Sequence, residues 1–334
     1  MSEFISPTLS YSLLSPILVV FAGAIIGVLI EAFASKSIRP IAQVSVSIGT
    51  LVLALVQVWR IRSSSSTTAA MGSVIIDGPG LLLQGSILII SIIAVFLIAD
   101  TENFAAAPAA IPGSPEERES IARGQQVTEV FPLTLFAVAG MLIFPIASDL
   151  ITLFVALEVL SLPLYLMAGL SRRRRLLSQE SALKYFLLGA FSSAFFLFGA
   201  AYLYGYSGSI SFAGIQDAVV GGTGNDVFLL IGIAFLSIGL LFKVGAVPFH
   251  AWTPDVYQGA PTPVTAFMAA ATKVAAFGAM LRIYYTVFAN AEWSWRPLIT
   301  GIAIITMVFG SLVAISQRDV KRMLAYSSIA HAGF

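Results

Sequence analysis

Long hydrophobic runs, separated by short polar segments, dominate the chain. A helix needs about 20 mostly apolar residues to cross the hydrocarbon core of a bilayer, and nine runs come close to or exceed that length. Because a backbone in lipid must satisfy its own hydrogen bonds, each run is predicted to be helical. The predicted helices span 13–34, 41–59, 81–99, 130–147, 149–170, 181–206, 227–247, 262–288 and 298–315.

A tenth hydrophobic segment begins near residue 322 and continues to Phe334, with no glycine terminator or polar tail. The pattern therefore predicts an all-α polytopic membrane protein with nine complete transmembrane helices and the start of a tenth. We expect the chain to be part of a longer protein. Two polar stretches, Ser63 to Thr68 and Asp100 to Glu129, are predicted to be solvated connectors.

Composition supports a membrane protein and excludes several kinds of chemistry. The chain is 58% hydrophobic and 10% charged, whereas soluble domains carry about 25% charged residues. It has no cysteine, which excludes iron–sulfur clusters and disulfides within it. Its two histidines, His250 and His331, argue against bis-histidine haem ligation. No glycine-rich phosphate-binding pattern is present. Gly23 and Gly27 have the small-residue spacing of packed membrane helices, but chance is the better explanation of this spacing in a glycine-rich chain.

The positions of Lys and Arg predict the orientation in the membrane. With the N-terminus outside, eleven of these residues fall in inside loops and three in outside loops. Basic residues accumulate in cytoplasmic loops, so we predict an external N-terminus, a cytoplasmic 171–180 loop and a bacterial plasma-membrane location. The inside group is Lys36, Arg39, Arg118, Arg123, Arg172, Arg173, Arg174, Arg175, Arg318, Lys321 and Arg322.

The charged residues within the apolar runs include Glu158, Lys184, Lys243 and Lys273. A charge near the bilayer centre costs several kcal/mol, roughly 2.5–3.5 on insertion scales, so these residues indicate charge or ion movement through the membrane. The alternative is a fixed ion pair that holds helices in register. Lys184 has a further alternative, because it lies near a helix start and its side chain can extend to the interface.

A proline-rich stretch from Val247 to Val264 predicts a break in the seventh helix. Proline removes a backbone donor and clashes with the carbonyl four residues back, and Lys243 lies five residues before Pro248. Broken helices in transporters admit water at membrane depth, which favours a hydrated proton site at Lys243. His250 follows the break and is a candidate relay at neutral pH, or else a histidine hydrogen-bonded in a turn.

Four segments resemble a known family. They read ALEVLSLPLYLMAGL, LLFKVGAVPFHAWTPDVYQGAPTPVTAF, AATKVAAFG and KRMLAYSSIAHAGF, and they look like the antiporter-like membrane subunits of respiratory complex I. Among these subunits, E-x-x-S-L-P-L-Y and W-T-P-D-V-Y-Q-G-A-P-x-P-V are most similar to the subunit N branch of bacterial NADH–quinone oxidoreductase. The sister subunits L and M usually read W-L-P-D-A at the second motif. The resemblance runs from about residue 130 to the end, whereas 1–129 fits in hydropathy alone.

The resemblance implies a fourteen-helix fold that contains two inverted five-helix repeats. Residues 1–129 would hold helices 1–3 and a cytoplasmic loop, 130–290 the first repeat with a broken helix seven, and 291–334 the start of the second. It also implies roles: Glu158 couples to Lys243 on helix seven, and Lys273 continues a horizontal polar axis. A lysine expected on helix twelve lies beyond the chain.

The resemblance implies lesser roles for two more residues on the proton path. Lys184 corresponds to an assisting lysine on helix six, and His331 corresponds to a polar position on helix ten. His250, the candidate relay beside the break, is also expected on this path.

The function that the resemblance implies is proton translocation within NADH:quinone oxidoreductase, driven by quinone reduction elsewhere in the complex. No cofactor or metal is expected in this chain; NAD, FMN, iron–sulfur clusters and quinone would belong to partner subunits. The expected partners are other membrane subunits, including sister antiporter-like subunits, together with the lipid bilayer and protons, and no nucleic acid. Two alternatives stay open: a subunit of an Mrp-type cation/proton antiporter, and a structural membrane scaffold.

Overall fold

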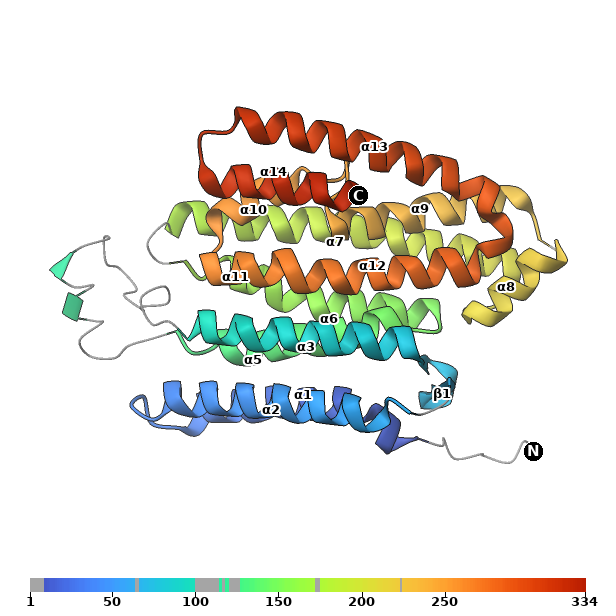
Figure 1. Cartoon of the computed structure of the whole chain (residues 1–334). Helices are drawn as coiled ribbons and strands as arrows, with labels where there is room; N and C mark the ends of the chain where they lie inside the picture. The colour runs from blue at the N-terminus through green and yellow to red at the C-terminus, as the bar shows by residue number, and fades with distance from the viewer. Residues whose placement is uncertain are drawn as a thin grey trace.

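The computed structural model describes residues 9–63, 66–99, 114–115, 118–119, 127–171, 175–222 and 224–334. Their helices run side by side in one bundle (Figure 1). Within these residues, eight helices are long and apolar enough to cross a membrane, and Val130–Ile146 forms a shorter apolar helix. The predicted helical segments are confirmed. They are α1 Tyr11–Phe33, α2 Arg39–Ile61, α3 Gly78–Ile98, α5 Val130–Ile143 with η3 Phe144–Ile146, α6 Leu150–Ala168, α7 Arg175–Ser207, α9 Asp226–Val244, α11 Thr262–Phe267 with α12 Lys273–Arg282, α13 Glu292–Ser316 and α14 Val320–Gly333.

One predicted boundary is wrong. The 171–180 stretch was expected to be a loop, but α7 begins at Arg175 and adds nearly two turns before residue 181. Ser178 helps to fix this start, because its hydroxyl donates to Ala168 O of α6 at 2.7 Å. Helix formation does not require apolar residues, so a helix can extend past its hydrophobic stretch. Arg172 to Arg174 lie outside the described residues.

A small hairpin and a short helix cover one end of the bundle. Strands β1 Thr67–Ala69 and β2 Val74–Ile76 pair antiparallel, with Thr67 opposite Ile76, and η1 Ala70–Gly72 joins them. Helix α8 Phe212–Gly221 lies at the same end (Figure 1). The predicted connector from Ser63 to Thr68 therefore includes the first residues of a strand. Most of the predicted 100–129 connector lies outside the described residues.

The predicted break in the seventh helix is confirmed. Helix α9 ends at Val244, and Gly245 adopts the left-handed conformation at φ 77° that favours glycine. The Gly245 amide donates to Leu241 O and Phe242 O, which satisfies two carbonyls at the helix end. After the cis Val247–Pro248 bond, the chain forms the short helix α10 Trp252–Gly259.

Close helix contacts at glycines hold the bundle together. A Cβ atom built at Gly140 of α5 would lie 2.4 Å from Leu160 N of α6, and one at Gly199 of α7 would lie 2.4 Å from Leu236 N of α9. A Cβ atom at Gly23 would lie 2.4 Å from the Thr50 side chain. Chance therefore does not explain the spacing of Gly23 and Gly27, because Gly23 marks a real contact of α1 with α2.

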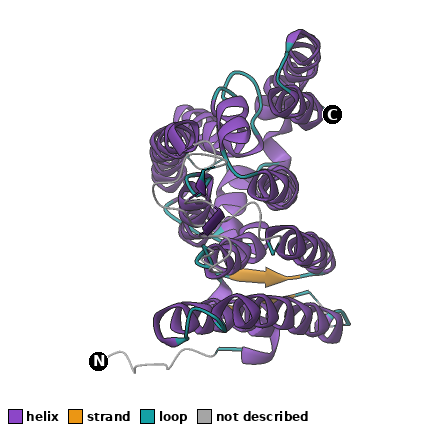
Figure 2. Ribbon diagram, turned by 90° about the vertical axis from the view of Figure 1, so that its left-hand side faces the viewer, coloured by secondary structure: helices purple, strands orange, loops and turns teal. Residues whose placement is uncertain are grey.

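The helices form an elongated cross-section. Figure 2 shows the N-terminal helices at one end of this section and the C-terminus at the other. The first pair, α1 and α2, packs against α5, while α13 packs against α14. Helices α5, α6 and α9 lie in the middle, and nearly every residue of α5 is buried. Two of these helices carry candidate site residues, Glu158 on α6 and Lys243 on α9.

Candidate functional site

Lys243 is the most deeply buried charged residue of the predicted set. It lies in the last turn of α9, its residue is 3% exposed, and its Nζ donates to Ser161 Oγ of α6 at 2.7 Å. The ammonium also lies 5.7 Å from the centroid of the Tyr185 ring of α7, within range of a cation–π contact. Because α9 stops at Gly245, the positive charge lies at the helix end where carbonyls favour it.

Glu158 lies one turn before Ser161 on α6 and accepts a short hydrogen bond from Ser193 Oγ of α7. Both carboxylate and ammonium are described, and no ion pair within 4 Å joins Glu158 to Lys243. Each charge instead binds a hydroxyl on a neighbouring helix. The structure thus brings the two predicted residues into one region without locking them together.

Lys273 forms a second lysine site, which is partly buried. Its Nζ donates to Ser328 O at 2.5 Å and to Ser328 Oγ at 2.6 Å, both on α14. A π-helical turn, Met268–Thr272, immediately precedes the lysine and joins α11 to α12. Such π-helical turns occur frequently at functional sites. No sequence pattern predicts this turn, since its residues also occur in ordinary α-helices.

An aromatic column extends from the Lys243 site into α10. Tyr185 stacks on Trp252 of α10 with ring centroids 4.6 Å apart and 6° between the planes. Trp252 contacts Tyr257 edge-on, with ring centroids 6.1 Å apart. Ring contacts therefore lead from the Lys243 ammonium through Tyr185 and Trp252 to Tyr257.

Sequence reasoning missed this aromatic column. Its residues come from α7 and α10, and only the fold shows that they stack. The signal available beforehand was the occurrence of two aromatic residues within W-T-P-D-V-Y, beside the predicted break.

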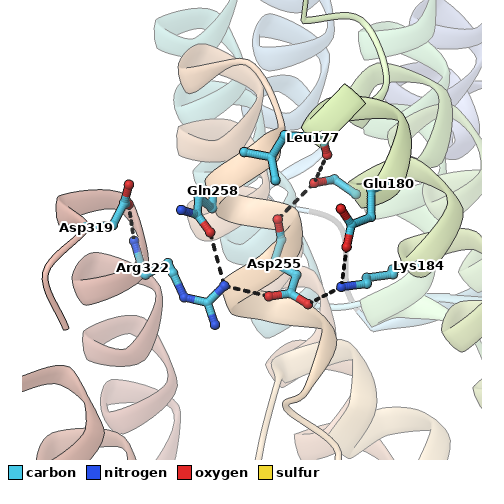
Figure 3. Close-up of polar contacts among 8 residues, drawn as sticks. Leu177, Glu180, Lys184, Asp255, Gln258, Asp319 and Arg322 are labelled. Atoms are coloured by element: carbon cyan, nitrogen blue, oxygen red, sulfur yellow. Dashed lines mark hydrogen bonds and ion pairs between the residues drawn. The ribbon is translucent and has the colours of Figure 1, made fainter. Parts of the chain in front are cut away.

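Lys184 lies apart from Glu158 and Lys243. Its side chain is 41% exposed and binds Glu180 of its own helix and Asp255 of α10, each at 2.7 Å. Arg322 of α14 binds the other oxygen of the same aspartate at 2.6 Å (Figure 3). The predicted assisting role of Lys184 stays a prediction. The carboxylates that Lys184 contacts, Glu180 and Asp255, are both partly exposed.

Asp255 is a charged residue that sequence reasoning did not single out. It lies on α10, outside the apolar spans of α9 and of residues 262–287. Partial burial by itself raises the pKa of the Asp255 carboxyl, but hydrogen bonds from Lys184 and Arg322 outweigh this and hold that pKa below its ordinary value. The carboxylate therefore stays ionised at neutral pH.

The two predicted histidines lie outside the lysine axis. His250 packs its ring on Phe309 of α13, with centroids 4.8 Å apart, and near Tyr326 of α14 at 6.4 Å. His331 is exposed, and its Nδ1 lies 2.8 Å from Ser327 O. Among the described residues, neither ring contacts Lys243 or Lys273, so the relay roles of the two histidines stay predictions. Across the described ranges, no three side chains of His, Asp or Glu gather as metal ligands do.

A bundle of membrane helices with a broken helix, a buried lysine before the break and a partly buried lysine after it is typical of ion-translocating membrane proteins. The chain belongs to the family described as NADH:quinone oxidoreductase/Mrp antiporter, transmembrane, whose model matches residues 147–334. This match includes Glu158, Lys243 and Lys273.

Particular relatives agree with the subunit N resemblance. The chain is 55% identical over 354 residues to NADH-quinone oxidoreductase subunit N of Rhodococcus opacus, covering 98% of this chain and 65% of that protein. It is 54% identical over 347 residues to the protein of the same name from a Nocardioides species, covering 99% of this chain and 65% of that one. The predicted resemblance to subunit N is confirmed. The chain spans about two thirds of the length of these relatives.

Two solved structures share the fold. A chain of respiratory complex I from Thermus thermophilus with bound aureothin has a TM-score of 0.74 and 33% identity, with 95% of this chain and 62% of that chain covered. A chain of the Mrp complex from a Dietzia species has a TM-score of 0.78 but 20% identity, with 97% of this chain and 58% of that chain covered. The second likeness concerns the fold alone.

Proposed function

We propose that the chain is a proton-translocating membrane subunit of a bacterial NADH:quinone oxidoreductase. The observation that carries the proposal is the environment of Lys243, whose ammonium is buried and bound to the neutral hydroxyl of Ser161 at 2.7 Å. A buried lysine without a direct carboxylate partner can gain or lose a proton when nearby charge or water changes. Glu158 of α6, which accepts a hydrogen bond from Ser193 of α7, is the nearby charge that biases this exchange.

The proton path would run along Glu158, Lys243 and Lys273. Ring contacts lead from the Lys243 ammonium through Tyr185 and Trp252 to Tyr257, and a π-helical turn, of a kind frequent at functional sites, immediately precedes Lys273. This chain supplies protonatable groups rather than a redox centre. Electron transfer from NADH to quinone, with NAD, FMN and iron–sulfur clusters, would take place in partner subunits.

The relatives named subunit N favour complex I over an Mrp-type antiporter, because the Dietzia likeness is confined to the fold. The partners would be other membrane subunits, including sister antiporter-like subunits. The α1–α2 and α13–α14 connections, whose sequences include Lys36 and Arg318, lie at the opposite end of the bundle from the β1–β2 hairpin (Figure 1). This distribution supports an external N-terminus in the bacterial plasma membrane.

Substitution of Lys243 in the assembled complex tests the proposal. Lys243→Met and Lys243→Arg should both abolish most NADH-driven proton pumping in inverted membrane vesicles, since arginine does not deprotonate in proteins. Exposed Lys36, changed to Met, is the matched control for loss of a lysine and should pump at the parental rate. Full pumping by the Lys243→Arg variant would exclude a proton-carrying role, and normal pumping by both variants would favour the scaffold alternative.

A further inference from the structure

One carboxylate, that of Asp255, joins three helices near the surface of the bundle. One of its oxygens binds Lys184 of α7 at 2.7 Å, and the other binds Arg322 of α14 at 2.6 Å. Arg322 also donates to Gln258 Oε1, one turn further along α10, at 3.1 Å. In Figure 3 the two cations approach Asp255 from opposite sides, so α10 is held between α7 and α14.

Backbone contacts strengthen the same junction. The hydroxyl of Ser181 on α7 donates to Asp255 O at 2.9 Å. On the other side, Lys321 Nζ donates to Ala260 O, just beyond the end of α10, at 2.7 Å. A cation at the C-terminal end of a helix stabilises it. Both neighbours of α10 therefore bind its backbone as well as its aspartate.

The same turn of α10 also reaches the buried site. Trp252 lies three residues before Asp255 and stacks on Tyr185, which directly follows Lys184 on α7. Neighbouring residues of α7 thus hold one turn of α10, Lys184 by charge and Tyr185 by ring stacking. The Lys243 ammonium lies 5.7 Å from the centroid of the same Tyr185 ring.

We propose that Asp255 is a positioning residue for the buried lysine site. By holding the cations of α7 and α14 together, it fixes α10 and therefore the Trp252–Tyr185 stack that faces Lys243. Lys184 acts through this aspartate and does not itself carry protons. This inference rests on the proposed function, because it holds that the ion pairs of Asp255 support proton transfer at Lys243.

Variants of Asp255 in the intact complex test the inference. Asp255→Asn keeps the side-chain shape and removes the charge, so both ion pairs are lost. Pumping per NADH oxidised should fall about fivefold, the factor expected for two partly exposed ion pairs lost together, at an unchanged amount of complex on a native gel. Asp255→Glu restores a carboxylate and should recover at least half of the pumping. The matched control is Glu180→Gln, which removes a contact at the same 2.7 Å from Lys184 but within one helix, and it should pump normally.

A double variant shows whether Lys184 acts only through Asp255 or has an independent role. Lys184→Gln should lower pumping about twofold, because the Asp255–Arg322 pair remains, and should lower it no further in the Asp255→Asn background. The inference would be overturned if Lys184→Gln still lowered pumping about twofold in the Asp255→Asn background. Normal pumping by Asp255→Asn, or pumping by Asp255→Glu as low as that of Asp255→Asn, would also overturn it. If Asp255→Asn does not assemble, Lys184→Gln decides, and unchanged pumping rejects the inference.

The two proposals fail in different ways. Full pumping by Lys243→Arg rejects the proposed function itself. Loss of pumping in Lys243→Arg together with normal pumping in Asp255→Asn rejects only the positioning role.

Discussion

Removing the hydroxyl of Ser161 is the most direct test of how the Lys243 ammonium is bound. Ser161 is 1% exposed, and it accepts from Lys243 Nζ at 2.7 Å while its own proton is donated to Leu157 O. The serine is thereby oriented, with its lone pair toward the ammonium. Ser161→Ala removes this acceptor and leaves no other hydrogen-bond partner for the ammonium among the described residues.

The expected size of this effect follows from the kind of bond that is lost. A hydrogen bond to a charged group contributes about 1.5–3 kcal/mol, which corresponds to roughly a 10- to 150-fold change in the population of the bonded state. We expect NADH-driven pumping by Ser161→Ala to fall at least tenfold at equal amounts of assembled complex. Ser161→Thr retains the hydroxyl and should keep a larger share of pumping.

The control is a buried serine without a charged partner. Ser91 of α3 is buried and donates only to Ile87 O of its own helix, at 2.6 Å, in the contacts of the described residues. Ser91→Ala should therefore pump at the parental rate. Parental pumping by Ser161→Ala would refute the argument, because it would show that the charge of Lys243 does not depend on this hydroxyl.

Three further predictions concern neighbouring positions. Glu158→Gln should lower pumping severalfold and Glu158→Asp less, since only the latter keeps a charge near Lys243; equal losses in vesicle assays would point to geometry instead. Lys273→Ala should lose pumping while the complex remains visible on a native gel, and loss of assembly would support a structural role for its bonds to Ser328. Gly140→Val should reduce the amount of assembled complex strongly, because even a Cβ would lie 2.4 Å from the α6 backbone; normal assembly measured on the same gel would contradict this.

The helices could be predicted well because each is a long apolar run. The break after α9 could also be predicted, because Pro248 cannot continue a helix and Gly245 favours the left-handed backbone that ends it. The start of α7 at Arg175 was missed since the helix continues into polar sequence, where hydropathy gives no signal. Likewise, β1 and β2 have three residues each, too few for a periodic pattern.

Several residues of the site could be predicted from the sequence, but their contacts with one another could not. A buried lysine such as Lys243 is visible in sequence because charge in an apolar run is costly. Its partner Ser161 is not visible, since serine is common in membrane helices and only the packing of α6 on α9 pairs them. Asp255 was missed because it follows the break, where a charge is unremarkable in composition. The contact of Lys184 with Asp255 joins residues 71 positions apart, and no local pattern specifies such a pairing.

The contacts of α14 have a consequence for the order of events during synthesis. Lys273 binds a serine 55 positions later, and Asp255 binds an arginine 67 positions later. At about 5–20 residues per second, the ribosome needs roughly 3 to 13 s to make that stretch. During this interval Lys273 has no Ser328 to bind, and Asp255 has Lys184 but not yet Arg322 as a cationic partner. Insertion of α14 therefore supplies both missing partners, and a delay at this point would leave the Lys273 ammonium inside the bundle without its hydrogen bonds.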